Sequence, residues 1–267
     1  MPIQLSSLGA LISEIQINGW NILRKTVNDF SLWRLIEYPG VTRILEAEPG
    51  TRILDIGSGT SSYPLMLAQR GATVIALELE FARAEWQRTK ARQLHLNVLP
   101  VVGDGRALPF ASNTFTRITS VSAIEHIPND REVGVEMGRV LAPGGIAALS
   151  VPYTFRERQA FFRGLKSFER IAPNEFVQVG RGNLVRFYTD DDLDSHFAQP
   201  MHAQIERKSF FGRALLNDHY HETRWNRYWT HFIVKDLLLT WLVYPLEELF
   251  LRHTEPFGVI FRLRKQT

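Results

Sequence analysis

Short apolar runs alternate with stretches of helical spacing along the middle of the chain. The apolar runs are five or six residues long and rich in β-branched side chains, which is typical of buried strands. They lie at 52–56, 73–77, 98–102, 117–121 and 146–151, and helical spacing is found at 64–70, 81–94 and 130–141. This alternation over residues 51–151 predicts βαβ units, in which a parallel sheet is covered by helices on both faces.

The first 50 residues have a different pattern. Helical spacing runs from 5 to 23 and from 32 to 37, and the second helix is expected to end before Pro39 because proline interrupts helical hydrogen bonding. This segment carries aromatic residues but no combination of polar residues that indicates chemistry. We therefore interpret it as a packing element or a cap over the edge of the sheet.

A turn with two glycines follows the first predicted strand. Asp55 precedes Gly57, Ser58 and Gly59, and glycines at this spacing allow a tight turn and a close backbone approach to a ligand. A dinucleotide-binding fingerprint has a third glycine where this chain has Ser62, and no Lys or Arg follows as in a Walker phosphate loop. The turn therefore favours a ligand without phosphate groups.

Acidic residues follow the next two predicted strands. Glu78 ends the second strand, where a carboxylate can accept hydrogen bonds from both hydroxyl groups of a ribose. Asp104 follows the third strand, and its carboxylate or the neighbouring backbone can bind the exocyclic amine of adenine. Because ligands bind at the carboxyl ends of parallel strands, Asp55, Glu78 and Asp104 are expected to line one site.

Five segments, in this order, resemble the motifs of the class I S-adenosylmethionine-dependent methyltransferases, most closely their small-molecule type 11 branch. They are ILDIGSGTS (53–61), Glu78, GDGRALPF (103–110), SAIEHI (122–127) and RVLAPGG (139–145). Together they extend over about 100 residues. Thr116 departs from the family, which often has an aspartate there, but that residue is not a main cofactor contact.

The resemblance implies a Rossmann-like, doubly wound α/β sandwich with a mostly parallel seven-stranded sheet and an antiparallel last strand. Thr189 and Asp192 have the spacing of a helix N-cap, which resembles the start of the last βα unit. Strands six and seven are then expected at 202–208 and 258–264. Residues 1–50 are expected to form an N-terminal helical cap, and residues 51–267 a methyltransferase domain. Two insertions are expected within this domain, at about 152–190 and about 209–257.

The resemblance also implies S-adenosyl-L-methionine as the cofactor, and no metal site is expected. The residues expected to bind it follow the first four strands: Asp55, Gly57, Ser58, Gly59, Glu78, Leu79, Asp104, Gly105 and Ser122. In this arrangement Glu78 binds the ribose and Asp104 meets the adenine amine. Asp55 could orient the turn or reach the methionine ammonium through water.

A sulfonium methyl group is already activated, so the protein mainly aligns the acceptor and excludes water. A general base is needed only when the acceptor must lose a proton. His126, next to Glu125, is the candidate base, with capping of the following turn or packing against the cofactor as the alternative. Tyr153, just after strand five, is a candidate for binding the acceptor or the methionine carboxylate.

Segments outside the core are expected to select the acceptor. Residues 152–190 and 209–257 are rich in aromatic side chains, and residues 156–186 contain seven Lys and Arg against three acids. The aromatic residues favour a hydrophobic or aromatic small molecule, and the basic residues favour an anionic one. Core packing and a solvated face would explain the same residues. A nucleic acid is disfavoured because neither an RNA-binding module nor a long basic stripe is present.

Composition narrows the classes of protein further. A chain of 267 residues, 45% hydrophobic and 22% charged, fits one large domain with appendages. The absence of cysteine excludes disulfides, thiol nucleophiles and Cys-based metal sites. The formal net charge is +3, but the basic excess lies in 156–186 and 205–235, so the remainder of the chain is acidic. This distribution favours an acceptor with negative character.

The longest apolar run, 237–246, is too short to span a bilayer and is interpreted as a buried helix. Peripheral membrane contact through 232–251 and a homodimer remain open. Residues 1–10 contain no Lys or Arg and no long apolar run follows them, so we expect a cytoplasmic protein without a secretory leader. Two alternatives to methyl transfer also remain: a non-catalytic S-adenosylmethionine-binding or scaffold protein, and a Rossmann oxidoreductase.

Overall fold

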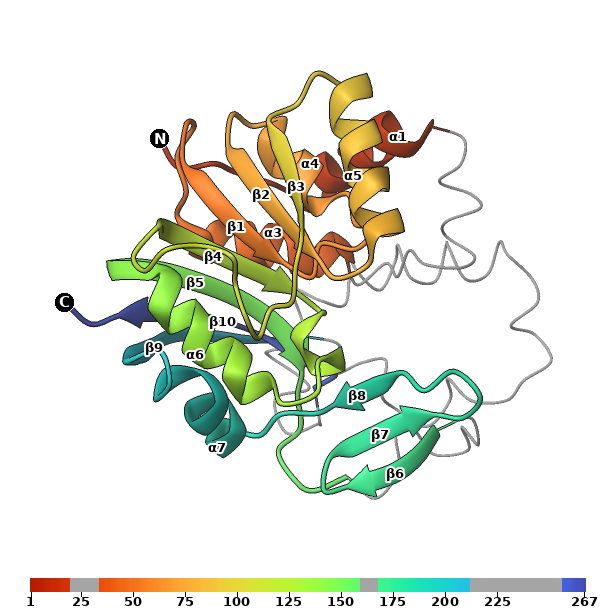
Figure 1. The fold of residues 1–267 in the computed structure, drawn as a ribbon, viewed down its shortest axis with the longest axis vertical. Coiled ribbons are helices and arrows are strands. Elements are labelled where there is room, and N and C mark those ends of the chain that lie inside the picture. Colours follow the sequence, from red (N-terminus) through yellow and green to blue (C-terminus); the bar gives the residue numbers. More distant parts are fainter. Residues whose placement is uncertain (20–33, 159–167, 212–255) are drawn as a thin grey trace.

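The computed structural model describes residues 1–19, 34–158, 168–211 and 256–267. A seven-stranded sheet with the order β3-β2-β1-β4-β5-β10-β9 forms its centre (Figure 1). The strands are β1 (Arg52–Ile56), β2 (Thr73–Glu78), β3 (Val98–Val102), β4 (Phe115–Val121), β5 (Leu141–Pro152), β9 (Ala203–Phe211) and β10 (Gly258–Lys265). The pairs formed by β1 to β5 are parallel, whereas β10 runs antiparallel to both β5 and β9. The predicted sheet, with its antiparallel last strand, is confirmed.

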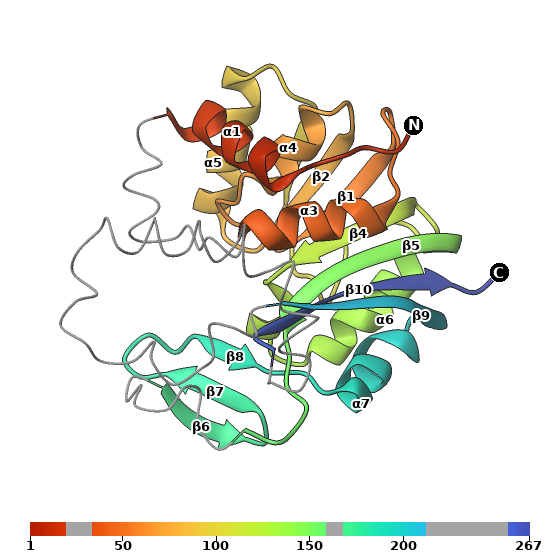
Figure 2. The ribbon, with the colours of Figure 1, turned by 180° about the vertical axis from the view of Figure 1, so that it is seen from behind.

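Helices cover both faces of this sheet. They are α1 (Ser7–Asn18), α3 (Arg34–Leu45), α4 (Tyr63–Ala68), α5 (Phe81–Gln93), α6 (Asp130–Val140) and α7 (Asp190–Leu193). One hydrophobic core joins the sheet to α1, α3, α4 and α5, and a second core joins the opposite face to α6, α7 and the turn that follows α7. Figures 1 and 2 show these helices on the two sides of the sheet. Burial on both faces explains why β1 and β2 read as continuous apolar runs.

The order of the strands reverses between β1 and β4. β1 lies between β2 and β4, so the chain crosses to one side of β1 and then to the other. Ligands of open α/β sheets bind beyond the carboxyl ends of the strands at such a point. The turns after β1, β2, β3 and β4 therefore lie together at one edge of the sheet, where a ligand crevice is expected.

The second helix of the N-terminal segment differs from its prediction. α3 continues through Pro39 to Leu45 instead of ending before the proline. A proline inside a helix costs about 3 kcal/mol, but α3 buries apolar side chains against the sheet, which offsets this cost. They are Leu35, Ile36, Tyr38, Val41, Ile44 and Leu45.

A small separate sheet lies between β5 and α7. It contains the antiparallel strands β6 (Phe168–Ala172), β7 (Glu175–Gln178) and β8 (Leu184–Arg186), and its core includes Phe176 and Phe187. The sequence pattern predicted an insertion here but not these strands. The Thr189 N-cap of α7 is confirmed, since Thr189 and Asp192 form a complete capping box.

Candidate functional site

The turn after β1 lies close against β2 and against the loop after β4. The amides of Gly57 and Ser58 donate to the carbonyl of Leu77 at 2.9 and 3.0 Å. Gly57 has a φ of +73°, in the left-handed region that favours glycine. A Cβ at Gly57 would lie 2.5 Å from the Cβ of Ala123, so only glycine allows the two loops to approach this closely.

Glu78 is buried at the end of β2 and connects two turns. Its Oε2 accepts a hydrogen bond from the Gly59 amide at 2.7 Å, and its Oε1 accepts one from the Glu80 amide at 3.1 Å. Each carboxylate oxygen has two lone pairs, so both retain capacity for another donor. The adjacent Leu79 is exposed and offers an apolar surface beside this carboxylate.

Asp55 is buried in β1, near Glu78. Burial raises the pKa of Asp55 well above its usual range, and the negative charge of Glu78 adds to this effect while Arg34 opposes it. A cationic group placed nearby would favour the ionised carboxylate. Asp55 therefore suits a site for a positively charged ligand.

Asp104 has a partner that the motif did not indicate. The Arg106 amide donates to Oδ1 at 2.9 Å and the Arg106 guanidinium donates to Oδ2 at 2.7 Å. Hydrogen bonds from Arg106 lower the pKa of Asp104. The paired guanidinium fixes the plane of the carboxylate. Next to it, Gly105 lies against Ile56, where an added Cβ would be 3.3 Å from Cγ2.

Ser122 brings an unexpected element into the site. Its Oγ donates to the Glu37 carboxylate at 2.5 Å, and the Ser150 Oγ donates to the same Oε1 at 2.6 Å. Arg34 donates to the other oxygen of Glu37 at 2.8 Å. The sequence pattern missed Arg34 and Glu37, because a charged pair of i,i+3 spacing on a helix gives no signal that it is buried.

His126 lies in the short 3₁₀ turn after β4, Ile124–His126, and contacts the small sheet. Its Nδ1 lies 2.5 Å from the carbonyl oxygen of Leu184, and its Nε2 lies 3.9 Å from Glu125 Oε1. The imidazole is half exposed, whereas Glu125 is buried, and burial raises the pKa of Glu125. Because a carbonyl oxygen only accepts hydrogen bonds, Nδ1 is the donor in this contact.

Tyr153 is buried at the end of β5 rather than open to the crevice. Its hydroxyl donates to Asp190 Oδ1 at 2.9 Å, and the Lys208 ammonium lies 2.8 Å from the same oxygen. Its ring packs against Phe155 and Phe210. The structure thus places Tyr153 in an anchoring contact that joins β5 to α7 and β9.

The basic segment 156–186 is partly engaged with the protein itself. The Arg158 guanidinium lies 4.3 Å from the centre of the Phe187 ring, and Arg186 pairs with Asp130 and Glu175. The predicted contact segment 232–251 and most of the insertion 209–257 lie outside the described residues. Within the described ranges, no group of three or more His, Asp or Glu is arranged to hold a metal ion.

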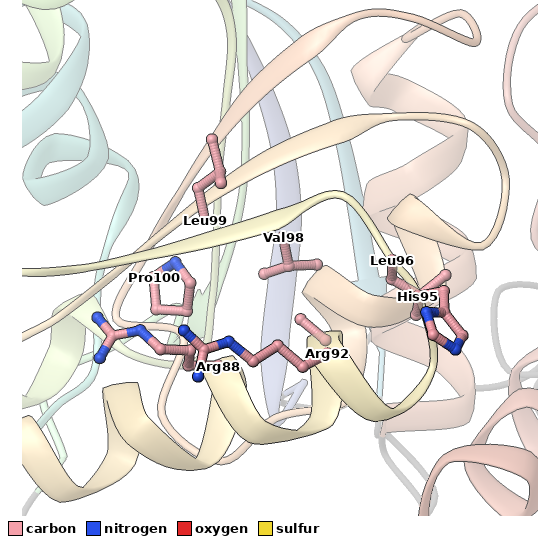
Figure 3. Close-up of a pocket in the computed structure, with 8 residues that line it drawn as sticks. Arg88, Arg92, His95, Leu96, Val98, Leu99 and Pro100 are labelled. Carbon is pink, nitrogen blue, oxygen red and sulfur yellow. The ribbon is translucent and has the colours of Figure 1, made fainter.

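A hollow on the far edge of the sheet contains none of the predicted site residues. It lies near the amino end of β3, and it is lined by Arg88, Ala91, Arg92, His95, Leu96, Val98, Leu99 and Pro100 (Figure 3). The candidate site follows the carboxyl ends of the strands, so this hollow is a separate feature. In the part of the chain that the structure describes, no helix is long and apolar enough to cross a membrane.

Comparison with known sequences identifies the central segment. Residues 54–149 match a family model described as "Methyltransferase domain". A demethylmenaquinone methyltransferase of Corynebacterium efficiens is 37% identical over 111 residues, which are 40% of this chain and 46% of the relative. The biotin biosynthesis bifunctional protein BioHC of Cellvibrio japonicus is 37% identical over 137 residues, 50% of this chain and 26% of the relative. The chain thus spans less than half the length of these relatives.

Solved structures share the fold over most of the chain. An S-adenosylmethionine-dependent methyltransferase from Mesorhizobium loti has a TM-score of 0.56 and 15% identity, with 86% of this chain and 96% of that chain covered. The [4+2]-cyclase SpnF has a TM-score of 0.60 and 16% identity, with 100% and 98% covered. At this level of identity the likeness concerns the fold alone.

Proposed function

We propose that this chain, whose residues 54–149 match a methyltransferase domain, is a class I S-adenosylmethionine-dependent methyltransferase that transfers the sulfonium methyl group to a small-molecule acceptor by direct in-line displacement. The observation that carries this proposal is the position of Glu78. It ends β2 beside the glycine turn and retains hydrogen-bonding capacity on both carboxylate oxygens.

The residues of the crevice fit S-adenosylmethionine. Glu78 would hold the ribose hydroxyls, Asp104 the adenine amine, and the turn at 57–59 would lie along the methionine part. Leu79 offers its exposed side chain to the adenine ring. Asp55 and Glu78 favour the positive charge of this cofactor. When bound, the cofactor supplies an activated methyl group, and the protein supplies alignment and exclusion of water.

We assign His126 the role of base for acceptors that carry a proton on the attacking atom. With Nδ1 donating to the Leu184 carbonyl, Nε2 is free to accept that proton. The buried Glu125, 3.9 Å from Nε2, would stabilise the imidazolium that forms. Tyr153 is buried and held by Asp190, and it is proposed to fix Phe155 and Phe210 in place rather than to transfer a proton.

The acceptor that the described residues favour is aromatic or hydrophobic. Phe155 is exposed and packs against Phe210 and the buried Tyr153, so an aromatic side chain is presented at the end of β5. The matched relatives include a demethylmenaquinone methyltransferase and the methyltransferase GfsG of Streptomyces halstedii, which is 33% identical over 112 residues. An anionic acceptor is less favoured, because Arg158 and Arg186 are engaged with Phe187 and with acids.

A second candidate function is cofactor binding without methyl transfer. The similarity in fold to the [4+2]-cyclase SpnF favours keeping it, since that fold occurs in a protein named for a different reaction. The oxidoreductase alternative is set aside because Ser62 replaces the third glycine and because the matching family model describes a methyltransferase domain. A cytoplasmic location remains part of the proposal.

The test is a methyl-transfer screen with radiolabelled cofactor. Quinols, phenols, polyketide-like hydroxyls and aromatic carboxylates are offered separately, and label in the organic extract is measured. Label in at least one aromatic or hydrophobic acceptor is the expected result. Cofactor uptake in a titration together with no labelled acceptor in any class would support the binding-only function.

A further inference from the structure

Helix α3 stands between two loops of the candidate site. Glu37 and Tyr38 are adjacent on this helix, yet they contact different loops. Glu37 accepts a hydrogen bond from Ser122 in the loop after β4, and the Tyr38 hydroxyl lies 2.8 Å from the Ser61 hydroxyl in the turn after β1. Successive side chains on a helix differ in direction by about 100°, because one turn takes 3.6 residues. Adjacent residues can therefore reach separate loops.

The contact through Glu37 is buried and makes three hydrogen bonds. One oxygen accepts from Ser122 and Ser150, and the other accepts from Arg34. Ser122 has a φ of +46°, a conformation that is unfavourable for a residue with a side chain. Its amide also donates to the Ser150 carbonyl at 2.9 Å. These contacts hold Ser122 in a conformation that it would otherwise leave.

The position of Ser122 fixes the start of the loop after β4. Ala123, the next residue, is the one that lies against Gly57 in the turn after β1. Glu125 and His126 come next, within the same short turn. The contacts that hold Ser122 therefore position both Ala123, which lies against the turn after β1, and His126, the proposed base.

The contact through Tyr38 supports the other loop. The Ser61 Oγ that faces the Tyr38 hydroxyl also accepts the Tyr63 amide at 3.1 Å, at the start of α4. The rings of Tyr38 and Tyr63 stack with their centres 4.9 Å apart, and both are buried. Tyr38 is therefore fixed by packing and can hold Ser61 in place.

We infer that Glu37 and Tyr38 are positioning residues, through which α3 sets the turn after β1 and the loop after β4 relative to each other. What these loops bind rests on the proposed function, but the contacts themselves do not. The N-terminal segment is then part of the site machinery, although neither residue touches the reacting atoms.

Amide hydrogen exchange of the full chain without cofactor separates the two contacts. Glu37→Gln is expected to lower protection of the Ser122 and His126 amides by about tenfold, because it removes the negative charge that strengthens these hydrogen bonds and the oxygen that accepts from Arg34. It should leave the turn at 57–63 within about twofold. Tyr38→Phe is expected to do the reverse, with about fivefold lower protection at Ser61 and little change at 122–127.

Two matched substitutions control for general effects. Tyr63→Phe removes a buried tyrosine hydroxyl that contacts Thr42 at 3.1 Å, and Glu85→Gln breaks a surface Arg–Glu pair of the same i,i+3 spacing on α5. Neither contacts the two loops through the altered group, so neither should change the exchange at 57–62 or 122–127. If Glu37→Gln does not fold, Ser150→Ala removes one bond to Glu37 and takes its place.

A cofactor titration in parallel keeps the inference separate from the proposed function. Tyr38→Phe is expected to weaken S-adenosylmethionine binding by about fivefold, while Tyr63→Phe leaves it unchanged. If the unsubstituted chain takes up no cofactor, the proposed function fails, and the exchange result still decides the inference. The crossed pattern of loop-specific losses supports the inference. Unchanged exchange in both loops, or an equal loss across the whole chain including α6, overturns it.

Discussion

Gly57 and Ala123 bring two loops of the site into direct contact. The left-handed φ of Gly57 and the 2.5 Å approach to Ala123 both require the absence of a Cβ. The sequence showed the first requirement through the spacing of Gly57 and Gly59, but not the second, because Ala123 is far away along the chain. The requirement for glycine at position 57 thus comes from the contact between two loops as well as from the conformation of its own turn.

The substitution Gly57→Ala is expected to lower the free energy of unfolding by about 3 kcal/mol, since it adds a steric clash to an unfavourable φ. Gly144→Ala is the control, because Gly144 has nearly the same φ, +72°, but open space around it. Its expected cost is about 1 kcal/mol. Urea denaturation of both variants measures the difference. Equal losses would show that the contact with Ala123 contributes nothing.

At His126, the proposed role as a base predicts a loss of turnover. His126→Asn keeps a side-chain donor for the Leu184 carbonyl but removes the group that accepts a proton. With a hydroxyl acceptor, kcat is expected to fall by about 100-fold, while KM for the cofactor should stay the same. A variant that keeps most of its kcat would make His126 a structural residue.

At the scale of elements, the strands and helices of residues 51–151 can be predicted from periodicity, whereas the segments before and after them cannot. The strand at 98–102 and the start of α7 were predicted at or near their observed bounds, because a short apolar run and a capping box are local signals. The small sheet β6–β8 was missed because its strands are short and mostly half-exposed. Helix α3 was cut short because the burial that offsets Pro39 is a tertiary effect.

In the candidate site, too, local sequence signals predict some residues, whereas residues that depend on tertiary contacts are missed. Residues at strand ends, such as Glu78 and Asp104, can be found from the register of the strands. Glu37 and Arg106 cannot, because their partners depend on how α3 and the turn after β3 fold back.

A buried charge cluster attaches the small sheet and the turn Asp194–Ala198 after α7 to α6. Asp130 Oδ2 accepts hydrogen bonds from Tyr188 at 2.5 Å and pairs with Arg186, and Oδ1 lies 2.9 Å from His196 Nδ1. Burial alone would raise the pKa of Asp130, but hydrogen bonds from His196 and Tyr188 and the charge of Arg186 outweigh it and lower the pKa. The folded protein therefore binds this proton less readily than the unfolded chain.

This depressed pKa predicts acid sensitivity. The contribution of Asp130 is present in full above its unfolded pKa of about 4 and is lost as the pH falls through the lower folded value. Asp130→Asn is expected to lower the free energy of unfolding by about 2 to 3 kcal/mol at pH 7 and to flatten its decline below pH 4. Denaturant unfolding between pH 7 and pH 3 provides the measurement, with the exposed Asp194→Asn as control. Parallel declines for Asp130→Asn and the unsubstituted chain would contradict this role.

At the scale of the whole molecule, basic and acidic residues are concentrated in different parts of the chain. The basic excess lies in 156–186 and 205–235, while the remainder of the chain, which includes the strand-end acids, is acidic. A crevice with Asp55, Glu78 and Asp104 suits a cofactor that carries a sulfonium and an ammonium group. The weak overall basicity is thus a property of these two segments rather than of the cofactor site.

Calorimetric titration with S-adenosylmethionine measures whether the chain binds this cofactor through Glu78. We expect one saturable site and about ten- to hundredfold weaker binding in Glu78→Gln, because charge-assisted bonds to the ribose are lost. Glu80→Gln should bind unchanged, since its side chain pairs with Arg83 at 3.0 Å. A nicotinamide dinucleotide should give no heat. Absence of binding by the unsubstituted chain, or equal affinity in Glu78→Gln, would show that Glu78 does not hold this cofactor.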